Sequence, residues 1–363
     1  MLGATIGGYQ VESLLGAGGM GEVFVATHAL IGKRVAIKVL REEHSRNDEL
    51  VGRFFREARA VTLLRHPSCV EVIDTGKLPD GRGYIIMELL EGESLHARIK
   101  RQPPTLAEQL SIARQLTDVL GSAHEKGIIH RDLKPENVFL LNDAAAAAGW
   151  RVKVLDFGVA KLTEPAGAAG AAGAMPVMTN PNALIGTPAY MAPEQCKGAA
   201  FVDQQSDIYA LGIILFEMAC GRTPFLGPGF GDYLMGHLRE PVPLPSSLAT
   251  VDARLEKTIL RALAKDKAER HPTMRELGAE LAAIAAPPPK QVASAEAVTM
   301  RGGPIPAELL ATVRKAQPPI VAAPPPSTKK PPAASRTPLA LLAFSVAIVV
   351  AAIVAAIAWR FTR

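Results

Sequence analysis

The sequence predicts a two-lobed α+β domain, with a small β-rich lobe before a larger helical lobe, and a single membrane-spanning helix after it. Three observations predict this class. Residues 9–40 contain apolar, β-branched runs separated by Gly-rich or polar turns, which is typical of strands. Helical spacing of apolar residues dominates after about residue 105. Residues 339–359 are apolar and contain no charge, Gly or Pro.

The small lobe is expected to alternate strands with one helix. The strands are expected at residues 9–15, 22–29, 34–40, 70–75 and 84–89. The helix is expected over 47–65, where Leu50, Phe54, Glu57, Val61 and Leu64 recur at spacings of four and three residues and so share one face. Helices follow from about residue 105, and we expect a cleft between the two lobes.

The net charge of the chain differs between the two-lobed part and the tail that follows it. Residues 285–363 hold nine Lys or Arg and two Asp or Glu, whereas residues 1–284 have a net charge of −2. A nucleic-acid-binding domain should carry the basic face itself, so this distribution argues against nucleic acid as a partner. A basic tail suits an anionic membrane surface instead.

The tail itself is expected to have three parts. Residues 285–338 contain thirteen prolines and predict a Pro/Ala-rich disordered linker, because such a stretch buries too little apolar surface to offset its ordering entropy. As a helix, residues 339–359 would span about 31 Å, enough to cross the hydrocarbon core of a bilayer. Residues 360–363 would form a short end. The N-terminus shows no basic run followed by an apolar core, so we expect no secretory signal.

A glycine-rich motif, GAGGMGEV, occupies residues 16–23. A dinucleotide site shares this GxGxxG spacing, but it needs a helix at the glycines and an acidic residue about 20 positions later. Here a strand pattern follows, and Lys38 lies 17 residues past Gly21. Backbone N–H groups of such a hairpin, with a lysine nearby, suit a triphosphate. A plain glycine turn is the alternative.

Glu57 stands out on the predicted helix because it lies between Phe54 and Val61 on the apolar face. A carboxylate that faces a core is unfavourable unless it is paired, and Lys38 is the natural partner. The alternative is a glutamate at the helix edge, in water.

Two further motifs carry oxygen donors. The sequence HRDLKPEN at residues 130–137 is followed by DFG at residues 156–158, after an alternating strand at Val152 and Val154. Asp132, Asn137 and Asp156 are donors of the type that Mg²⁺ binds or that a reacting hydroxyl needs nearby. Each one alone could be a turn or cap residue.

Together these motifs resemble the eukaryotic-type Ser/Thr protein kinase family, and the chain looks like a bacterial, membrane-attached member. The resemblance covers residues 9–284, with an N-lobe over about 9–87 and a C-lobe over about 91–284. The sequence MAPE at residues 191–194 is similar to the end of that family's activation segment, and SDIYALG at 206–212 to its next helix. The resemblance implies a buried Glu194–Arg270 ion pair and a structural role for Asp207.

The resemblance implies ATP as the nucleotide and Mg²⁺, with Mn²⁺ as a substitute, as the metal. Asn137 and Asp156 would bind the metal ion, and Glu57 would orient Lys38 toward the α- and β-phosphates. Met87 would line the back of the adenine pocket. The implied ATP-binding residues are Leu15, Gly16, Ala17, Gly18, Gly19, Met20, Gly21, Val23, Ala36, Lys38, Met87, Glu88, Leu90, Asn137 and Asp156.

For the phosphoryl acceptor, the resemblance implies that Asp132 accepts the hydroxyl proton and that Lys134 steadies the γ-phosphate, a lysine that marks the Ser/Thr branch. His130 would be structural and would pack near Phe157. Arg131 implies control by phosphorylation of the activation loop. We predict Thr179 as the phosphorylated residue and a structural role for Thr187. The string AGAAGAAGAM at 166–175 is an insertion in the same loop.

The implied function is ATP-dependent phosphorylation of Ser and Thr residues on protein substrates in bacterial signalling, with autophosphorylation of the activation loop. The kinase domain would lie on the cytoplasmic side of the bacterial inner membrane, held by a single span. A homodimer could form through a kinase lobe or through the small-residue stripe of Ala343, Ala347, Ala351 and Ala355. The alternative is a catalytically silent, kinase-like membrane scaffold. It would be indicated by loss of a motif residue such as Lys38 or Asp132, and none is lost.

Overall fold

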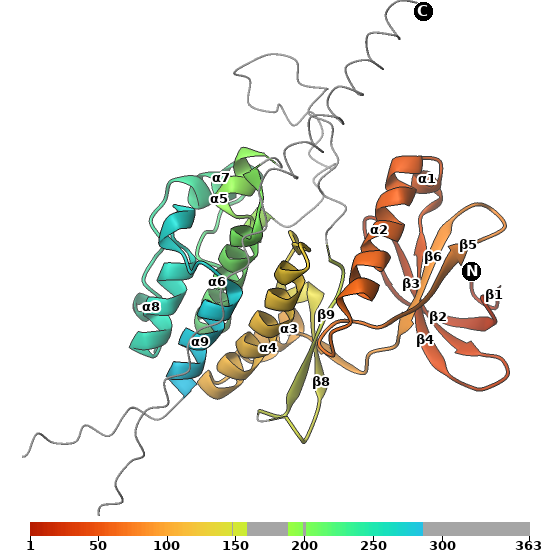
Figure 1. Ribbon diagram of the computed structural model, residues 1–363, viewed down its shortest axis with the longest axis horizontal. Helices are drawn as coiled ribbons and strands as arrows, with labels where there is room; N and C mark the ends of the chain where they lie inside the picture. The colour runs from red at the N-terminus through yellow and green to blue at the C-terminus, as the bar shows by residue number, and fades with distance from the viewer. Residues whose placement is uncertain (147, 158–187, 199–200, 286–363) are drawn as a thin grey trace, which may run out of the picture. The chain divides into compact units, whose positions relative to one another are not determined.

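The computed structural model describes residues 1–146, 148–157, 188–198 and 201–285. They form a β-rich N-lobe and a helical C-lobe (Figure 1). The N-lobe sheet is antiparallel, with six strands in the order β1-β2-β3-β4-β6-β5. The strands are β1 (Thr5–Ile6), β2 (Tyr9–Ala17), β3 (Gly21–His28), β4 (Arg34–Leu40), β5 (Val72–Lys77) and β6 (Gly83–Glu88). The predicted strands are present, with their ends shifted by a few residues.

The N-lobe helix α2 (Asp48–Leu64) follows a short helix α1 (Glu42–Ser45). It begins where the Asn47 side chain accepts the N–H groups of Glu49 and Leu50, and it ends at Arg65 in the left-handed conformation. The predicted apolar face is buried, including Phe54 and Glu57, except that Leu50 is only half-buried. This face therefore presents Glu57 to the interior of the lobe.

A small second sheet, in the order β7-β8-β9, lies at the start of the C-lobe. Its strands are β7 (Gly92–Ser94), β8 (Val138–Asn142) and β9 (Trp150–Val154). The sequence predicted only the last of them. Helices α3 (Leu95–Arg101) and α4 (Leu106–Glu125) lie between β7 and β8 in the chain, and α4 starts with a capping box formed by Thr105 and Glu108.

The C-lobe is built around α6 (Gln204–Cys220), which is buried along most of its length. A helix that is apolar on all sides belongs in a core rather than at a surface. The other C-lobe elements are α5 (Pro193–Lys197), α7 (Phe230–Leu238), α8 (Ala253–Ala262), α9 (Met274–Ala285) and the 3-10 turns Pro135–Asn137, Pro188–Tyr190, Pro245–Ser247 and Lys267–Glu269. Helices α4 and α9 pack side by side (Figure 1).

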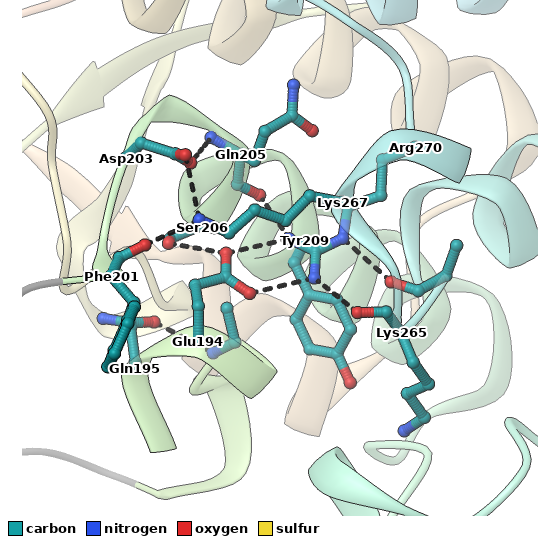
Figure 2. A network of polar contacts seen from close by, with 12 residues as sticks. Glu194, Gln195, Phe201, Asp203, Gln205, Ser206, Tyr209, Lys265, Lys267 and Arg270 are labelled. Atoms are coloured by element: carbon teal, nitrogen blue, oxygen red, sulfur yellow. Dashed lines mark hydrogen bonds and ion pairs between the residues drawn. The ribbon is translucent and has the colours of Figure 1, made fainter. Parts of the chain in front are cut away.

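A buried ion pair joins α5 to the segment before α9 (Figure 2). Arg270 donates from Nη1 and Nη2 to the two carboxylate oxygens of Glu194, each at 2.9 Å. Ser206 adds a hydrogen bond of 2.7 Å to the same carboxylate. Burial alone would raise the pKa of Glu194, but the guanidinium of Arg270 lowers it. The ion pair implied by the family resemblance is therefore present.

Within the described ranges, no helix is both long enough and apolar enough to cross a membrane. The predicted span at 339–359 and the tail at 360–363 lie outside these ranges, as does the predicted linker beyond residue 285. Ala285, expected as the first linker residue, is the last residue of α9.

We predict that Arg270→Ala lowers the free energy of unfolding by about 3–5 kcal/mol, because it leaves the buried Glu194 carboxylate without its cation. The measurement is urea unfolding at neutral pH. Arg275→Ala is the control, since its ion pair with Glu125 is exposed and is worth about 1 kcal/mol or less. Equal losses in the two variants would contradict the prediction.

Candidate active site

Lys38 lies at the centre of the site, in the middle of β4. Strand pairing places it opposite Val23 of β3 and Ile85 of β6. Its Nζ lies 2.8 Å from Asp156 Oδ1 and 3.7 Å from Glu57 Oε1. One ammonium group is thus shared by a carboxylate from α2 and a carboxylate at the end of β9, and the expected Lys38–Glu57 pair is formed.

The shared charge affects the two carboxyl groups differently. Burial raises the pKa of Glu57 to about 8, although Lys38 pulls it in the opposite direction. Burial also disfavours the ionised form of Asp156, but the closer contact with Lys38 wins and lowers its pKa. The pKa of Lys38 is raised, because the two carboxylates outweigh the desolvation of its ammonium. Asp156 is therefore the partner that stays ionised most readily.

The loop that carries Asp132 is held by a buried carboxylate. Asp207, near the start of α6, accepts the backbone N–H of His130 and that of Arg131, each at 2.8 Å. His124 adds a third contact at 2.8 Å. Burial disfavours the ionised form of Asp207, but the contact with His124 and the neighbouring donors lower its pKa. The structural role implied for Asp207 is therefore to hold the backbone of the loop that carries Asp132.

His130 is fully buried, and it links the Asp132 loop to the end of β9. Its Nε2 donates to the Leu155 carbonyl at 3.2 Å, and its Nδ1 accepts the Asp132 N–H at 3.3 Å. Its ring lies 4.7 Å from that of Phe157, so the expected packing contact is present. Burial lowers the pKa of His130, which favours the neutral ring that these two hydrogen bonds require.

The predicted acceptor-side residues lie together in this loop. Lys134 Nζ lies 3.3 Å from Asp132 Oδ2, and both side chains are partly exposed. Asn137 donates from Nδ2 to the Asp132 carbonyl at 2.9 Å. The Asn137 carbonyl accepts the Leu155 N–H, which ties the loop to the residue before Asp156.

Asn137 and Asp156 fit a magnesium ion by their chemistry. The amide nitrogen of Asn137 is engaged, so its oxygen is the atom that can bind a cation, and Asp156 supplies a carboxylate whose Oδ1 contacts Lys38. No group of three His, Cys, Asp or Glu side chains with metal-binding geometry occurs among the described residues. Mg²⁺ is usually held by one or two protein donors together with phosphate oxygens and water, so two donors are sufficient here.

Most of the predicted nucleotide-binding residues lie on the strands of the N-lobe sheet or on the turn between β2 and β3. The hairpin of β2 and β3 carries residues 15–21, which are exposed except for Met20 and Gly21. A Cβ atom on Gly21 would lie 2.4 Å from the Val39 carbonyl oxygen, so this position requires glycine. Val23 and Ala36 lie on the adjacent strands β3 and β4. Behind them, a cavity of about 20 Å³ is lined by Met87 together with Lys38, Glu57 and Asp156.

Lys153 is a site residue that the sequence analysis missed. It is buried on β9, and its Nζ donates to Glu88 Oε1 at 2.5 Å and to the Cys69 carbonyl at 3.1 Å. The N–H of Glu88 donates to the Glu71 carbonyl. Alternation along β9 places the Lys153 side chain on the other face of the strand from Val152 and Val154. The sequence does not show that this other face is also buried. Thr179 and Thr187 lie outside the described residues.

Comparisons with known proteins agree with one another. Residues 9–277 match the family model of the protein kinase domain. The chain is 43% identical over 272 residues to the serine/threonine-protein kinase Pkn1 of Myxococcus xanthus, a match that covers 75% of this chain and 37% of Pkn1. It is 35% identical over 305 residues to the serine/threonine-protein kinase PknB of Mycolicibacterium smegmatis, covering 82% of this chain and 46% of PknB.

Among solved structures, the kinase domain of Mycobacterium tuberculosis PknI superposes with a TM-score of 0.58 at 28% identity. The match to that structure, of a cysteine-to-alanine mutant, covers 79% of this chain and 99% of the PknI domain. The chain spans 32–50% of the length of three curated relatives that it matches, all serine/threonine-protein kinases of Myxococcus xanthus.

We predict that the free energy of unfolding of the wild type decreases more than that of Glu57→Gln as the pH rises from 5 to 8. The folded-state pKa of Glu57 is raised to about 8, so the folded chain binds more protons than the unfolded chain between pH 4.5 and 8. The stability that this proton provides is lost as the pH rises through the folded-state pKa. Urea unfolding of both proteins at several pH values tests this, and parallel pH profiles would contradict it.

Proposed function

Because the chain belongs to the protein kinase family, we propose that it transfers the γ-phosphoryl group of ATP to serine and threonine side chains of other proteins. The observation that carries the proposal is the convergence of Lys38, Asp156 and Glu57 beside a loop that holds Asp132 and Lys134 together. The names of Pkn1 and PknB, which describe those proteins as serine/threonine-protein kinases, support the choice of acceptor.

In this proposal the nucleotide-side residues provide position and charge. Lys38 holds the α- and β-phosphates, with Glu57 and Asp156 fixing its direction. The glycine-rich hairpin covers the phosphates with backbone N–H groups. Asn137 and Asp156 hold Mg²⁺, which supplies charge neutralisation for the phosphate oxygens. Positioning and charge neutralisation account for most of the catalysis in phosphoryl transfer.

On the acceptor side, Asp132 orients the substrate hydroxyl and receives its proton at a carboxylate oxygen. Lys134, 3.3 Å from that carboxylate, places a positive charge where the γ-phosphate would lie. The buried His130 is unsuited to act as a base, since its two ring nitrogens are already bonded to Leu155 and Asp132. Among the described residues no observation favours the silent scaffold, because Lys38, Asp132, Asn137 and Asp156 are all present and make contacts in the site.

We propose that Arg131 binds a phosphate on the activation loop, for which Thr179 is our candidate. The Nε and Nη1 atoms of Arg131 are buried and have no hydrogen-bond partner among the described residues, so the guanidinium has donors available for an anion. Phosphopeptide mapping of the active protein tests the choice of Thr179, which fails if that residue carries no phosphate.

We predict that Asp132→Asn lowers the rate of phosphoryl transfer to a generic protein substrate by at least about 10²-fold, the usual contribution of a positioned acid–base group. The substitution leaves Lys38, Glu57 and Asp156 in place, so nucleotide affinity should persist. Transfer of radiolabel from γ-labelled ATP and nucleotide binding are measured on the same samples. Asp74→Asn, a change at an exposed residue of β5, is the control and should remain active.

If the wild type itself transfers no label, the proposed activity is wrong. If Asp132→Asn transfers label at the wild-type rate, the role of Asp132 is wrong even if the activity is right.

We also propose that residues 339–359 anchor the chain in the bacterial inner membrane, with the kinase domain in the cytoplasm, where ATP is available. The length and apolar composition of this segment support the proposal. A dimer through the Ala343, Ala347, Ala351 and Ala355 stripe is a further hypothesis. It fails if leucine at these four positions leaves the dimer fraction in membranes unchanged.

We predict that the full chain stays with membranes after an alkaline wash and that a double substitution, Val349→Lys with Ala352→Lys, releases it. Each lysine at the middle of a span costs about 2.5–3.5 kcal/mol of insertion free energy. Ala322→Lys with Ala323→Lys, in the predicted linker, adds the same charge outside the span and should leave the chain bound. Release of the wild type by the wash would refute the anchor.

A further inference from the structure

The peptide unit that precedes Asp132 has an unusual backbone geometry. Arg131, the residue before it, has a φ of +65°, a left-handed conformation that is unfavourable for non-glycine residues. Such a conformation persists only where surrounding contacts fix it. The N–H of Arg131 is fixed by Asp207, as described above, and in the next peptide unit the Asp132 N–H donates to His130 Nδ1 at 3.3 Å.

Gln195, on α5, fixes the carbonyl side of that peptide unit. Its Nε2 donates to the Arg131 carbonyl oxygen at 2.8 Å, across 64 positions of sequence. Its Oε1 accepts the backbone N–H of Ala192 at 2.9 Å. The side-chain amide is therefore held at both ends, and Gln195 lies next to Glu194 of the buried ion pair (Figure 2). Its orientation is set by a rigid part of the C-lobe.

We propose that Gln195 is a positioning residue for phosphoryl transfer, one that sets the direction of the peptide before Asp132 and hence the direction of the Asp132 carboxylate. Asp207 holds the peptide group before the Arg131 Cα atom, and Gln195 and His130 hold the two sides of the peptide group after it, so together they define the conformation of Arg131. Because α5 follows directly after residues 188–192, the contact also couples the catalytic loop to that segment. This inference rests on the proposed kinase activity.

The simpler explanation is that Gln195 only caps helix α5 through Ala192. Capping requires only the side-chain oxygen, so it does not account for the hydrogen bond from Nε2 to the Arg131 carbonyl. The two roles use different atoms of one side chain, so a single substitution can separate them. Gln195→Glu keeps an oxygen for the Ala192 N–H, in a place where negative charge is favoured, and removes the donor to Arg131.

The experiment compares the full chain carrying Gln195→Glu, Gln195→Met or Gln204→Glu with the wild type. Gln195→Met removes both contacts without adding charge. Gln204→Glu adds the same charge in the first turn of α6 and is the matched control. Three quantities are measured: kcat and KM for ATP with a generic protein substrate, the melting temperature, and hydrogen exchange of the backbone amides of residues 130–134.

We expect kcat to fall about tenfold or more in both Gln195 variants, since misplacement of a reacting group by 1 Å can reduce a rate by about 10²-fold. KM for ATP should stay within about twofold, because the residues that hold the nucleotide are untouched. Exchange of residues 130–134 should accelerate in both variants, and the melting temperature of Gln195→Glu should match that of the wild type. Gln204→Glu should match the wild type in every measurement.

The inference is overturned if Gln195→Glu keeps wild-type kcat and exchange, because capping would then be the whole role. It is also overturned if exchange at residues 130–134 does not change in either Gln195 variant, since any loss of kcat would then arise without a change in the loop. If the wild type is inactive, the proposed function fails, and the exchange measurement still decides whether Gln195 holds the loop.

Discussion

The rest of the site depends on the hydrogen bonds that the Asp207 carboxylate accepts from the backbone of the loop before Asp132. It is buried near the start of α6, the helix around which the C-lobe packs, and it holds two consecutive backbone N–H groups. A buried charge is tolerated only when it is fully hydrogen-bonded, and here His124 completes the set. The loop that carries Asp132 is therefore positioned by the core of the lobe rather than by its own short sequence.

The two lobes contribute to one charge cluster. Lys38 and Glu57 come from β4 and α2, whereas Asp156 follows β9, so the Lys38–Asp156 contact spans the lobes. Lys153 joins them a second time through Glu88 and the Cys69 carbonyl. Because both contacts involve β9 or the residues just after it, a shift of that strand would change the charge cluster and the strand end at Glu88 together.

Much of this site could be predicted from the sequence, because its residues occur in motifs with fixed spacing. Glu57 is an example, since a carboxylate on an apolar helical face requires a partner. Lys153 and Gln195 could not be predicted, because their partners depend on which elements meet in space. The strand β7 was missed for a related reason, because it has three residues and pairs with β8, more than 40 positions further along the chain. The helix α2, with a regular apolar face and an asparagine cap, was predicted to within a residue at each end.

The buried ring of His130 has a consequence for how the protein responds to acid. A histidine in water gains a proton between pH 5 and 8, but burial makes this ring harder to protonate, and both of its nitrogens are committed. The two hydrogen bonds by which His130 connects Leu155 to Asp132 should thus persist under mild acidification.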